Sequence, residues 1–473
     1  MRQGAKAYFA ANLTAQVFAL IRFTLLARIL GPHELGLAAM ILLTSQFFQN
    51  VTDTGSDRFL VQDKDGDTPL MQGMVQLILV GRGVLLAVAM VLFAGVVASI
   101  FHESKVQPYL IGLAIAPLIG GFVHLDYLRV QRNSDFRPES AIILVSETLG
   151  LAGTMAAAFI TRDASAVVYG LAIRAAAMVA VSHLTAKRKY GWAFAREESL
   201  RFSKFGVPLM LNGLLIFFGS QGDRVIVANG LGTAALGHYS AIVLLIFNPV
   251  SMMMRLALSF YLPQVVRSRE TPEGYEAERD RLGGRVLLVS ILVLAGFVVV
   301  APIATPLLYG KSFTEPLLFF GLIGALQTAK FMRIWPSILA TSIGRSTIIL
   351  ANNIARIVGL PIAMAANWYS PSLGAIVGGF FVGEILALLT SLSLLHRADA
   401  VDMRREIVRV GAFLLWSGVI VGWAWALPSH QPAIMLGLAV ASVTAIALLA
   451  TERRVIGESI VLLRNRLRAR RRA

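Results

Sequence analysis

The fold class is decided by one apolar run, "LLVSILVLAGFVVVAPIATPLLY", which extends from Leu287 to Tyr309. The run carries no charge and is about as long as an α-helix must be to cross the hydrocarbon core of a bilayer. The whole chain shares this character, because 56% of its 473 residues are hydrophobic and only 15% are charged. Ordinary soluble domains carry roughly 25% charged residues. The sequence therefore predicts an all-α, polytopic integral membrane protein.

Hydrophobic runs separated by turn motifs predict about fourteen transmembrane spans. We expect these spans near residues 6–29, 35–60, 70–100, 107–129, 138–160, 165–186, 204–229, 233–266, 284–308, 314–341, 346–367, 373–395, 407–427 and 432–451.

The distribution of basic residues predicts the orientation of these spans. On one side the loops hold only Lys105, Arg162 and Lys311, whereas the other side holds most of the remaining Lys and Arg, including the tail "RNRLRARRRA" at 464–473. Because cytoplasmic loops concentrate basic residues, both termini are expected in the cytoplasm. The net charge of +16 is then explained by contact with anionic membrane lipid, and we expect no nucleic-acid partner.

Two similar phrases indicate an internal repeat. "LGPHELG" (residues 30–36) joins spans one and two, and "LGTAALG" (231–237) joins spans seven and eight, with five identities over Leu25–Met40 after a shift of 201. An offset of six spans keeps the orientation, so the sequence predicts two pseudo-symmetric six-helix lobes, 1–195 and 196–400. The segment 401–473 would then add helices 13 and 14 and the basic tail. Carriers built from such repeats bind substrate between the halves. Chance similarity between two glycine-ended helix turns is the alternative.

Charged residues inside the predicted spans are candidates for function, because an arginine facing lipid costs about 2.5–3.5 kcal/mol or more. The cations are Arg22, Arg28, Arg58, Arg82, Arg174, Arg224, Arg255, Lys330, Arg333 and Arg356. The acids are Asp53, Asp57, Asp126, Glu147, Asp223 and Glu384. Cations therefore outnumber acids, and we expect them to face a protein interior or a watery cavity.

Span two gives a polar stripe. At helical spacing Gln46, Gln49, Asn50, Asp53 and Asp57 fall within roughly a 100° arc, which predicts one face turned away from lipid.

Asp223 and Arg224 sit side by side in an apolar run of span seven. Sequence neighbours on a helix do not face each other, so each needs its own partner. Two interpretations of Arg224 stay open, a structural ion pair or a position on the cavity wall. Arg356 lies close to mid-span and is the stronger candidate.

Three phrases carry a family resemblance: "LLARILGPHELGLAAM" (25–40), "VTDTGSDRFLVQ" (51–62) and "GDRVIVANGLGTAALGHYSAI" (222–242). They resemble oligosaccharide flippases of the multidrug/oligosaccharidyl-lipid/polysaccharide exporter superfamily. The resemblance implies translocation of undecaprenyl-diphosphate-linked oligosaccharide from the cytoplasmic to the periplasmic leaflet of the bacterial inner membrane, by alternating access, for O-antigen, capsule or exopolysaccharide synthesis. A glycan polymerase or ligase machinery is a candidate partner.

A diphosphate suits the charges inside the spans, because guanidinium groups bind phosphate oxygens bidentately and stay charged when partly desolvated. The expected substrate-binding residues are Arg22, Arg224, Arg255, Arg333, Arg356, Gln46, Gln49 and Asn50. The acids Asp53, Asp57, Asp223 and Glu384 would either carry coupling protons or hold the arginines in place.

Other function classes fit less well. A drug or metabolite antiporter of the same superfamily would prefer an acidic cavity for cationic drugs. A membrane enzyme would need a sizeable outer loop, and the predicted outer loops are short. A scaffold without transport activity is the third alternative. The chain has no cysteine and no metal-like spacing of its seven histidines, and "GKS" (310–312) lacks the glycine that a phosphate-binding loop needs at Thr305. We therefore expect no catalysis, no cofactor and no metal.

Overall fold

The computed structural model describes residues 2–426, and this range consists of α-helices and one short 3₁₀ helix, with no strand. In chain order the helices are α1 (Arg2–Val51), α2 (Ser56–Gln62), α3 (Pro69–Ile100), α4 (Val106–Leu113), α5 (Ile115–Gly120), α6 (Asp126–Arg132), α7 (Arg137–Thr161), α8 (Ser165–Thr185), α9 (Arg196–Leu231), α10 (Thr233–Ser268), α11 (Pro272–Tyr309), η1 (Lys311–Phe313), α12 (Leu317–Met332), α13 (Ile334–Ser342), α14 (Ser346–Ile357), α15 (Gly359–Tyr369), α16 (Leu373–His396) and α17 (Met403–Ala426).

The prediction of an all-α polytopic membrane protein is confirmed. Within the described residues, eleven helical segments are long and apolar enough to cross a membrane. One of them, Lys6–Gln62, covers predicted spans one and two, and predicted span four corresponds to the shorter apolar stretch Val106–Gly120. Predicted span fourteen and the basic tail lie outside the described residues, so the total of fourteen stays a prediction.

Predicted span four is not the single helix that its hydrophobicity suggested. It is divided into α4, α5 and α6. Pro117 explains the first break, because it has no N–H to donate to the carbonyl of Leu113, four residues earlier. The chain then turns between Gly121 and Leu125 before α6 begins at Asp126.

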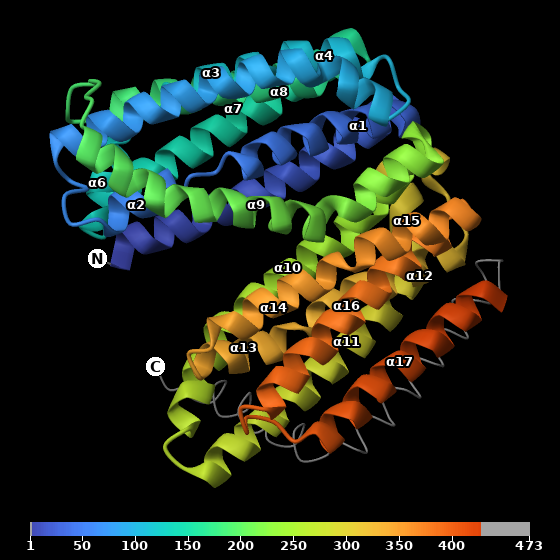
Figure 1. Cartoon of the computed structure of the whole chain (residues 1–473). Coiled ribbons are helices and arrows are strands. Elements are labelled where there is room, and N and C mark those ends of the chain that lie inside the picture. The colour runs from blue at the N-terminus through green and yellow to red at the C-terminus, as the bar shows by residue number, and fades with distance from the viewer. Residues whose placement is uncertain (1, 427–473) are drawn as a thin grey trace, which may run out of the picture. The chain divides into compact units, whose positions relative to one another are not determined.

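The contacts between α-carbons divide the chain into two compact units. Unit 1 comprises Met1–Ala241 with Leu308–Ser312, and unit 2 comprises the rest of the described chain. The lobe boundaries at 195 and 400 describe a sequence repeat and stay predictions. In unit 1, α7 packs along α8 and α1, and α9 packs along α1 (Figure 1). In unit 2, α16 packs against α12, α14 and α15 (Figure 1).

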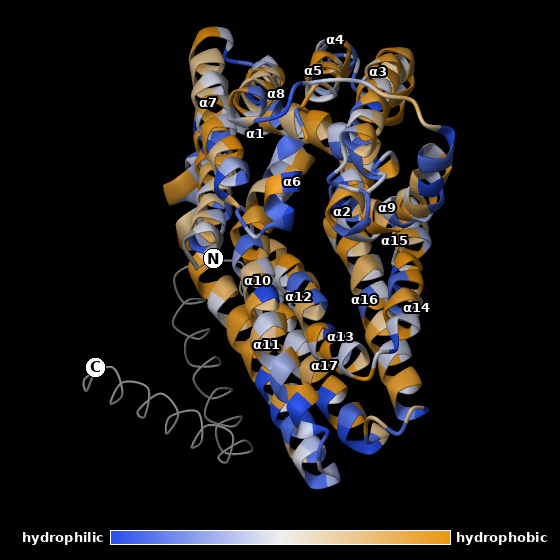
Figure 2. Cartoon of the chain, turned by 90° about the vertical axis from the view of Figure 1, so that its left-hand side faces the viewer, coloured by the Kyte–Doolittle hydropathy of each residue, from blue (hydrophilic) through white to orange (hydrophobic). Residues whose placement is uncertain are grey.

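Hydrophobic residues cover most of the ribbons of α3, α7 and α8, and hydrophilic residues gather near the start of α11 (Figure 2). This distribution is typical of helices whose sides face lipid and whose ends reach water. Many large apolar side chains are accordingly exposed, among them Leu85, Leu92 and Phe93 on α3.

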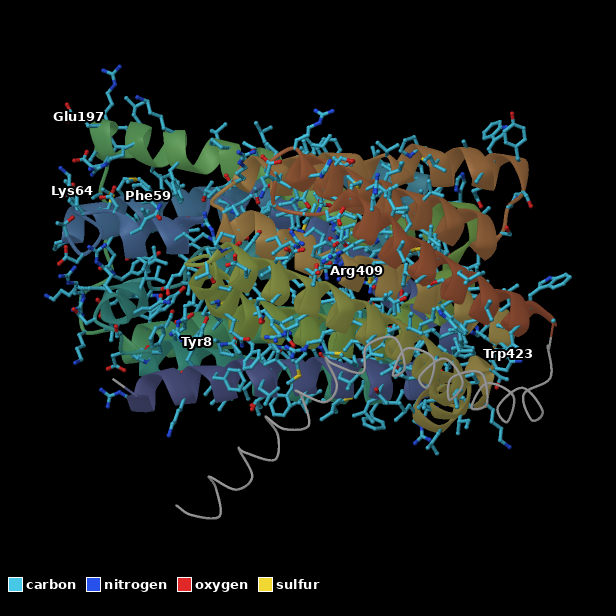
Figure 3. The ribbon with its side chains drawn as sticks, turned by 90° about the horizontal axis from the view of Figure 1, so that it is seen from below. Tyr8, Phe59, Lys64, Glu197, Arg409 and Trp423 are labelled. Carbon is cyan, nitrogen blue, oxygen red and sulfur yellow. The ribbon has the colours of Figure 1, made fainter. Side chains whose placement is uncertain are left out.

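The predicted cytoplasmic end of unit 1 is closed by an apolar cluster from α2, α3, α6 and α9. Phe59 of α2 and Phe202 of α9 pack edge to face, with ring centroids 5.1 Å apart. Lys64 and Glu197 lie beyond Phe59 at the same end of the unit (Figure 3). The cluster fixes α2 and the start of α9 against the bundle.

The two repeat phrases have the same backbone conformation. Gly31 has φ 77° and ψ 177°, and Gly232, its counterpart after the shift of 201, has φ 87° and ψ 179°. Residues with a Cβ rarely adopt this positive φ, so glycine is favoured at both breaks. Gly31 kinks α1, and Gly232 separates α9 from α10.

The same two phrases also contact each other within unit 1, and they do so reciprocally. A Cβ on Gly36 would lie 1.9 Å from the Thr233 carbonyl oxygen, and one on Gly237 would lie 2.0 Å from the Pro32 carbonyl oxygen. Pro32 and Thr233 are themselves related by the shift of 201. The two phrases are thus alike in backbone conformation and in contact, and the repeat of whole lobes stays a prediction.

Candidate functional site

The candidate residues predicted from the sequence are divided between the two units. Unit 1 holds Arg22, Gln46, Gln49, Asn50, Asp53, Asp57, Asp223 and Arg224, and unit 2 holds Arg255, Arg333, Arg356 and Glu384.

Helices α1 and α9 bring Gln46 and Arg224 together through a third residue, Gln221. The amide of Gln221 donates to Gln46 Oε1 at 2.9 Å, and Arg224 Nη1 donates to Gln221 Oε1 at 2.8 Å. All three side chains are only partly buried. The result is a continuous polar strip across two helices, with donors and acceptors of the kind that bind sugar hydroxyls and phosphate oxygens.

Asp223 turns away from this strip. Its side chain is buried, and its Oδ2 accepts a hydrogen bond from the hydroxyl of Tyr239 at 2.9 Å. Its Oδ1 accepts from the backbone N–H of Arg224 at 2.9 Å. The neighbouring acid and base therefore point to different surroundings, as the helical geometry predicted.

A second charged group lies on α1, α7 and α8. Glu147 forms an ion pair with Arg174, whose Nε lies 2.6 Å from Glu147 Oε1, and Arg22 Nη1 lies 3.7 Å from the other carboxylate oxygen. One buried carboxylate thus serves two arginines. Arg22 is a predicted site residue, whereas no sequence pattern distinguishes Arg174 from the other intramembrane cations.

The polar stripe of predicted span two is shorter than expected. Helix α1 ends at Val51, and Gly55 adopts the left-handed conformation, with φ 63° and ψ 34°, before α2 begins. Asp53 therefore lies in a turn, where its Oδ1 accepts from the Gly55 N–H at 3.0 Å, and Asp57 lies on the first turn of α2. The prediction that both acids continue the face of Gln46 was wrong, because α1 ends at Val51, before either acid is reached.

The remaining members of that stripe stay on α1. Gln49 donates from Nε2 to Ser45 Oγ at 2.9 Å. The backbone carbonyl of Asn50 lies against Gly213 of α9, where an added Cβ would approach it to 2.0 Å. Glycine at 213 thus allows α9 to lie directly on α1 beside these amides.

In unit 2 a buried triad joins three helical segments. Arg333, which lies between α12 and α13, forms an ion pair with Glu384 of α16 at 2.5 Å. Its Nη1 donates to Asn352 Oδ1 of α14 at 2.7 Å. The Arg333 side chain is only 9% exposed and that of Glu384 only 2%, so the two charges are paired with each other inside the protein.

Arg356 lies one helical turn after Asn352 on α14 and is half-buried, and Arg255 is an exposed residue of α10. Arg356 therefore shares α14 with Asn352, the partner of Arg333, whereas Arg255 lies on another helix of unit 2.

Sequence reasoning missed Gln221 and Tyr239, which supply the partners of Arg224 and Asp223. The spacing of Gln221, three residues before Arg224, was a usable signal for a pair on one helix face. The partner of Asp223 comes from a different helix, and no local pattern points to it. Within residues 2–426 no group of three or more His, Asp or Glu side chains is arranged to hold a metal ion.

Comparison with known proteins shows which family the chain belongs to. The family described as "Polysaccharide biosynthesis protein" matches residues 25–317, which is more than half of the chain. A "membrane protein in cps region" of Klebsiella pneumoniae is 22% identical over 392 residues, covering 81% of this chain and 80% of that protein. The lipopolysaccharide biosynthesis protein WzxC of Escherichia coli K12 is 19% identical, covering 63% of this chain and 60% of that protein. The succinoglycan biosynthesis transport protein ExoT of Rhizobium meliloti is 25% identical, covering 46% of this chain and 44% of that protein.

Solved structures share the fold. The lipid II flippase MurJ in an inward closed conformation matches with a TM-score of 0.71 at 12% identity, covering 95% of this chain and 99% of that one. An inward-facing multidrug resistance MATE transporter matches with a TM-score of 0.60 at 14% identity, covering 88% and 96%. With the family match over residues 25–317 and the many apolar helices, these findings identify the chain as a multi-pass membrane protein of the polysaccharide biosynthesis family.

Proposed function

We propose that the chain moves a polyprenyl-diphosphate-linked oligosaccharide from the cytoplasmic to the periplasmic leaflet of the bacterial inner membrane, with both termini in the cytoplasm. Such a headgroup cannot cross hydrocarbon unaided at a useful rate, because its charges and hydroxyls would lose water without gaining partners. A protein path must therefore offer replacement partners for both kinds of group.

The observation that supports this proposal best is the way three intramembrane arginines of unit 1 are paired, because two of them share one carboxylate and the third bonds to a neutral amide. Arg22 and Arg174 share the single carboxylate of Glu147. Arg224 bonds to the neutral amide of Gln221. A cationic drug would be repelled by such a surface, whereas a diphosphate would be attracted to it. The charge balance favours the glycan flippase over a drug antiporter of the same superfamily.

The proposed substrate-binding residues are Arg22, Arg224, Arg255, Arg333, Arg356, Gln46, Gln49 and Asn50, with Asp53, Asp57, Asp223 and Glu384 as coupling or structural acids. Among them Arg333 and Glu384 form a buried ion pair with each other, which fits a structural role. In this proposal the protein is a carrier and not an enzyme.

Deletion of the protein tests the substrate and the direction together. Cells without it should accumulate lipid-linked glycan units on the cytoplasmic leaflet, where an external glycan-modifying enzyme cannot reach them. Unchanged glycan export combined with new sensitivity to cationic drugs would reject the proposal in favour of the antiporter.

Substitution of Arg356 tests the site. Arg356→Ala should abolish export at normal membrane levels of the protein, and Arg356→Lys should restore it only in part, because an ammonium lacks the bidentate fork of guanidinium. Export and protein level should be measured in the same cells. Full export by Arg356→Ala would remove Arg356 from the site.

A further inference from the structure

Unit 1 contains a cavity that the sequence analysis did not anticipate. It has a volume of about 280 Å³ and lies among α1, α3, α5 and α8. Its polar lining residues are Ser45, Gln49, Arg82 and Arg174, and Leu86 and Met178 are among its apolar ones. The lining contains two arginines and no acidic residue.

Small residues create this space. Gly83 of α3 and Gly121 at the end of α5 let the two backbones approach, since a Cβ on Gly83 would lie 2.6 Å from the Pro117 carbonyl oxygen and 3.1 Å from Gly121 Cα. On the other side, Gly150 of α7 makes room for the stem of Arg174, where an added Cβ would lie 2.9 Å from Arg174 Cβ. The helices thus meet at glycines and leave a hollow beside the contact.

Arg82 is held at the cavity wall by neutral groups. Its Nε donates to Thr52 Oγ1 at 3.0 Å, and its Nη2 donates to the Gln49 carbonyl oxygen at 3.0 Å. Asp53 and Asp57 lie near enough to act on it electrostatically. Within the part of the chain that the structure describes, Arg82 forms no ion pair with either acid. Over residues 2–426, Nη1 of Arg82 makes no hydrogen bond, so this group keeps its charge and a free donor.

The guanidinium group of Arg174 is held by an ion pair on one side only. Its Nε faces Glu147, which it shares with Arg22, and the side chain is 43% exposed. Neither Nη group of Arg174 has a hydrogen-bond partner in the described chain. Two guanidinium groups therefore reach one cavity, each fixed through Nε and each with donors to spare.

We propose that this cavity binds a diphosphate or a similar oxyanion between Arg82 and Arg174. Guanidinium groups form short, charge-assisted hydrogen bonds with phosphate oxygens, and the side chains of Ser45 and Gln49 add neutral partners. The cavity is slightly smaller than the roughly 300–1,000 Å³ of sites for drug-sized ligands, so it suits a headgroup and not a whole glycan.

The diphosphate has two possible sources, the lipid-linked substrate or a free anion. The assignment to a lipid-linked substrate rests on the proposed function, whereas anion binding does not. Leu86 and Met178 give the cavity an apolar side that would accept the first part of a prenyl chain.

The test is a binding measurement on the full-length protein in detergent, following thermal unfolding as probe is added. The probes are sodium pyrophosphate, farnesyl diphosphate and, as an uncharged control, farnesol. Arg82→Gln and Arg174→Gln should each weaken diphosphate binding about tenfold or more, because each removes a charge-assisted hydrogen bond. Arg82→Lys should weaken it less. Arg285→Gln is the matched control, since Arg285 lines a separate cavity in unit 2 and should leave binding unchanged.

A second variant distinguishes loss of binding from loss of folding. Ala116→Leu fills part of the cavity and leaves all the charges in place, so it should weaken binding while the protein elutes as a single species. Stronger binding of farnesyl diphosphate than of pyrophosphate would support a lipid-linked ligand, and equal binding would support a free anion at the same site. Equal affinity in wild type, Arg82→Gln and Ala116→Leu, or no binding at all, would overturn the proposal. The two proposals can also fail separately. If diphosphate binding depends on Arg82 but deletion of the protein leaves glycan export intact, the proposed function is rejected and anion binding in the cavity is retained.

Discussion

At the scale of single residues, the intramembrane charges divide into groups with different surroundings. Arg333 and Glu384 are buried and face each other, whereas Arg82 and Arg174 keep free donors beside a cavity. Because unpaired charge is costly inside a membrane, the first pair is expected to stabilise the fold. Arg82 and Arg174 still have N–H groups without a partner in the described chain, and these groups are available to a ligand.

Removing one member of the buried pair should destabilise the protein more than removing both. Arg333→Met alone leaves Glu384 buried without its cation, and the loss should be about 3–5 kcal/mol, the range for broken buried pairs. The double variant Arg333→Met with Glu384→Met removes both charges and should recover most of that loss. Thermal unfolding of the purified variants measures this, and additive effects of the two single changes would argue against a structural pair.

Partner identities could not be predicted at this scale. The sequence showed that Asp223 and Arg224 need separate partners, and the structure supplies Tyr239 and Gln221. An ion pair such as Arg174 with Glu147 depends on how α7 and α8 are rotated about their axes, and at this contact Gly150 lies directly against the stem of Arg174. No pattern within one helix contains this information.

At the scale of helices, the apolar runs predicted where most elements lie, because a bilayer demands long and mostly apolar helices. The errors fall where a helix is interrupted inside an apolar or polar run. The break before Pro117 and the left-handed Gly55 both interrupt helices at residues that the hydrophobic pattern does not mark. The hydrophobic pattern shows only which residues avoid water. It therefore does not reveal a turn that lies within a predicted transmembrane span.

The contact between the two repeat phrases gives a prediction at this scale. Gly36→Ala and Gly237→Ala should each lower stability by about 1–3 kcal/mol, the usual effect of overpacking, because the new methyl meets a backbone carbonyl that cannot rotate away. Gly81→Ala on α3 is the control, since nothing lies within 4 Å of the added methyl. Unfolding temperatures in detergent measure the effect. Equal temperatures for Gly36→Ala and Gly81→Ala would show that the helices do not approach so closely.

At the scale of the whole molecule, the predicted orientation rests on where the basic residues lie, and it can be tested because the chain contains no cysteine. A single cysteine introduced anywhere is therefore the only thiol available to a label. The best positions are exposed in the structure and belong to loops whose sides differ in the predicted topology. Ser104 and Ser370 lie in predicted outer loops, and Lys64 and Thr271 lie in predicted cytoplasmic loops.

In intact cells, cysteine at position 104 or 370 should react with a membrane-impermeant maleimide, and cysteine at position 64 or 271 should react only after the cells are opened. The reason is the concentration of Lys and Arg on the side of residues 64 and 271, which is held back in the cytoplasm during insertion. Labelling all four variants in opened cells controls for burial of the thiol. Protection of positions 104 and 370 with reaction at 64 and 271 would invert the orientation, and with it the proposed direction of transport. A mixed result, with one position of each pair reversed, would instead mean that the number of spans between those positions was predicted wrongly.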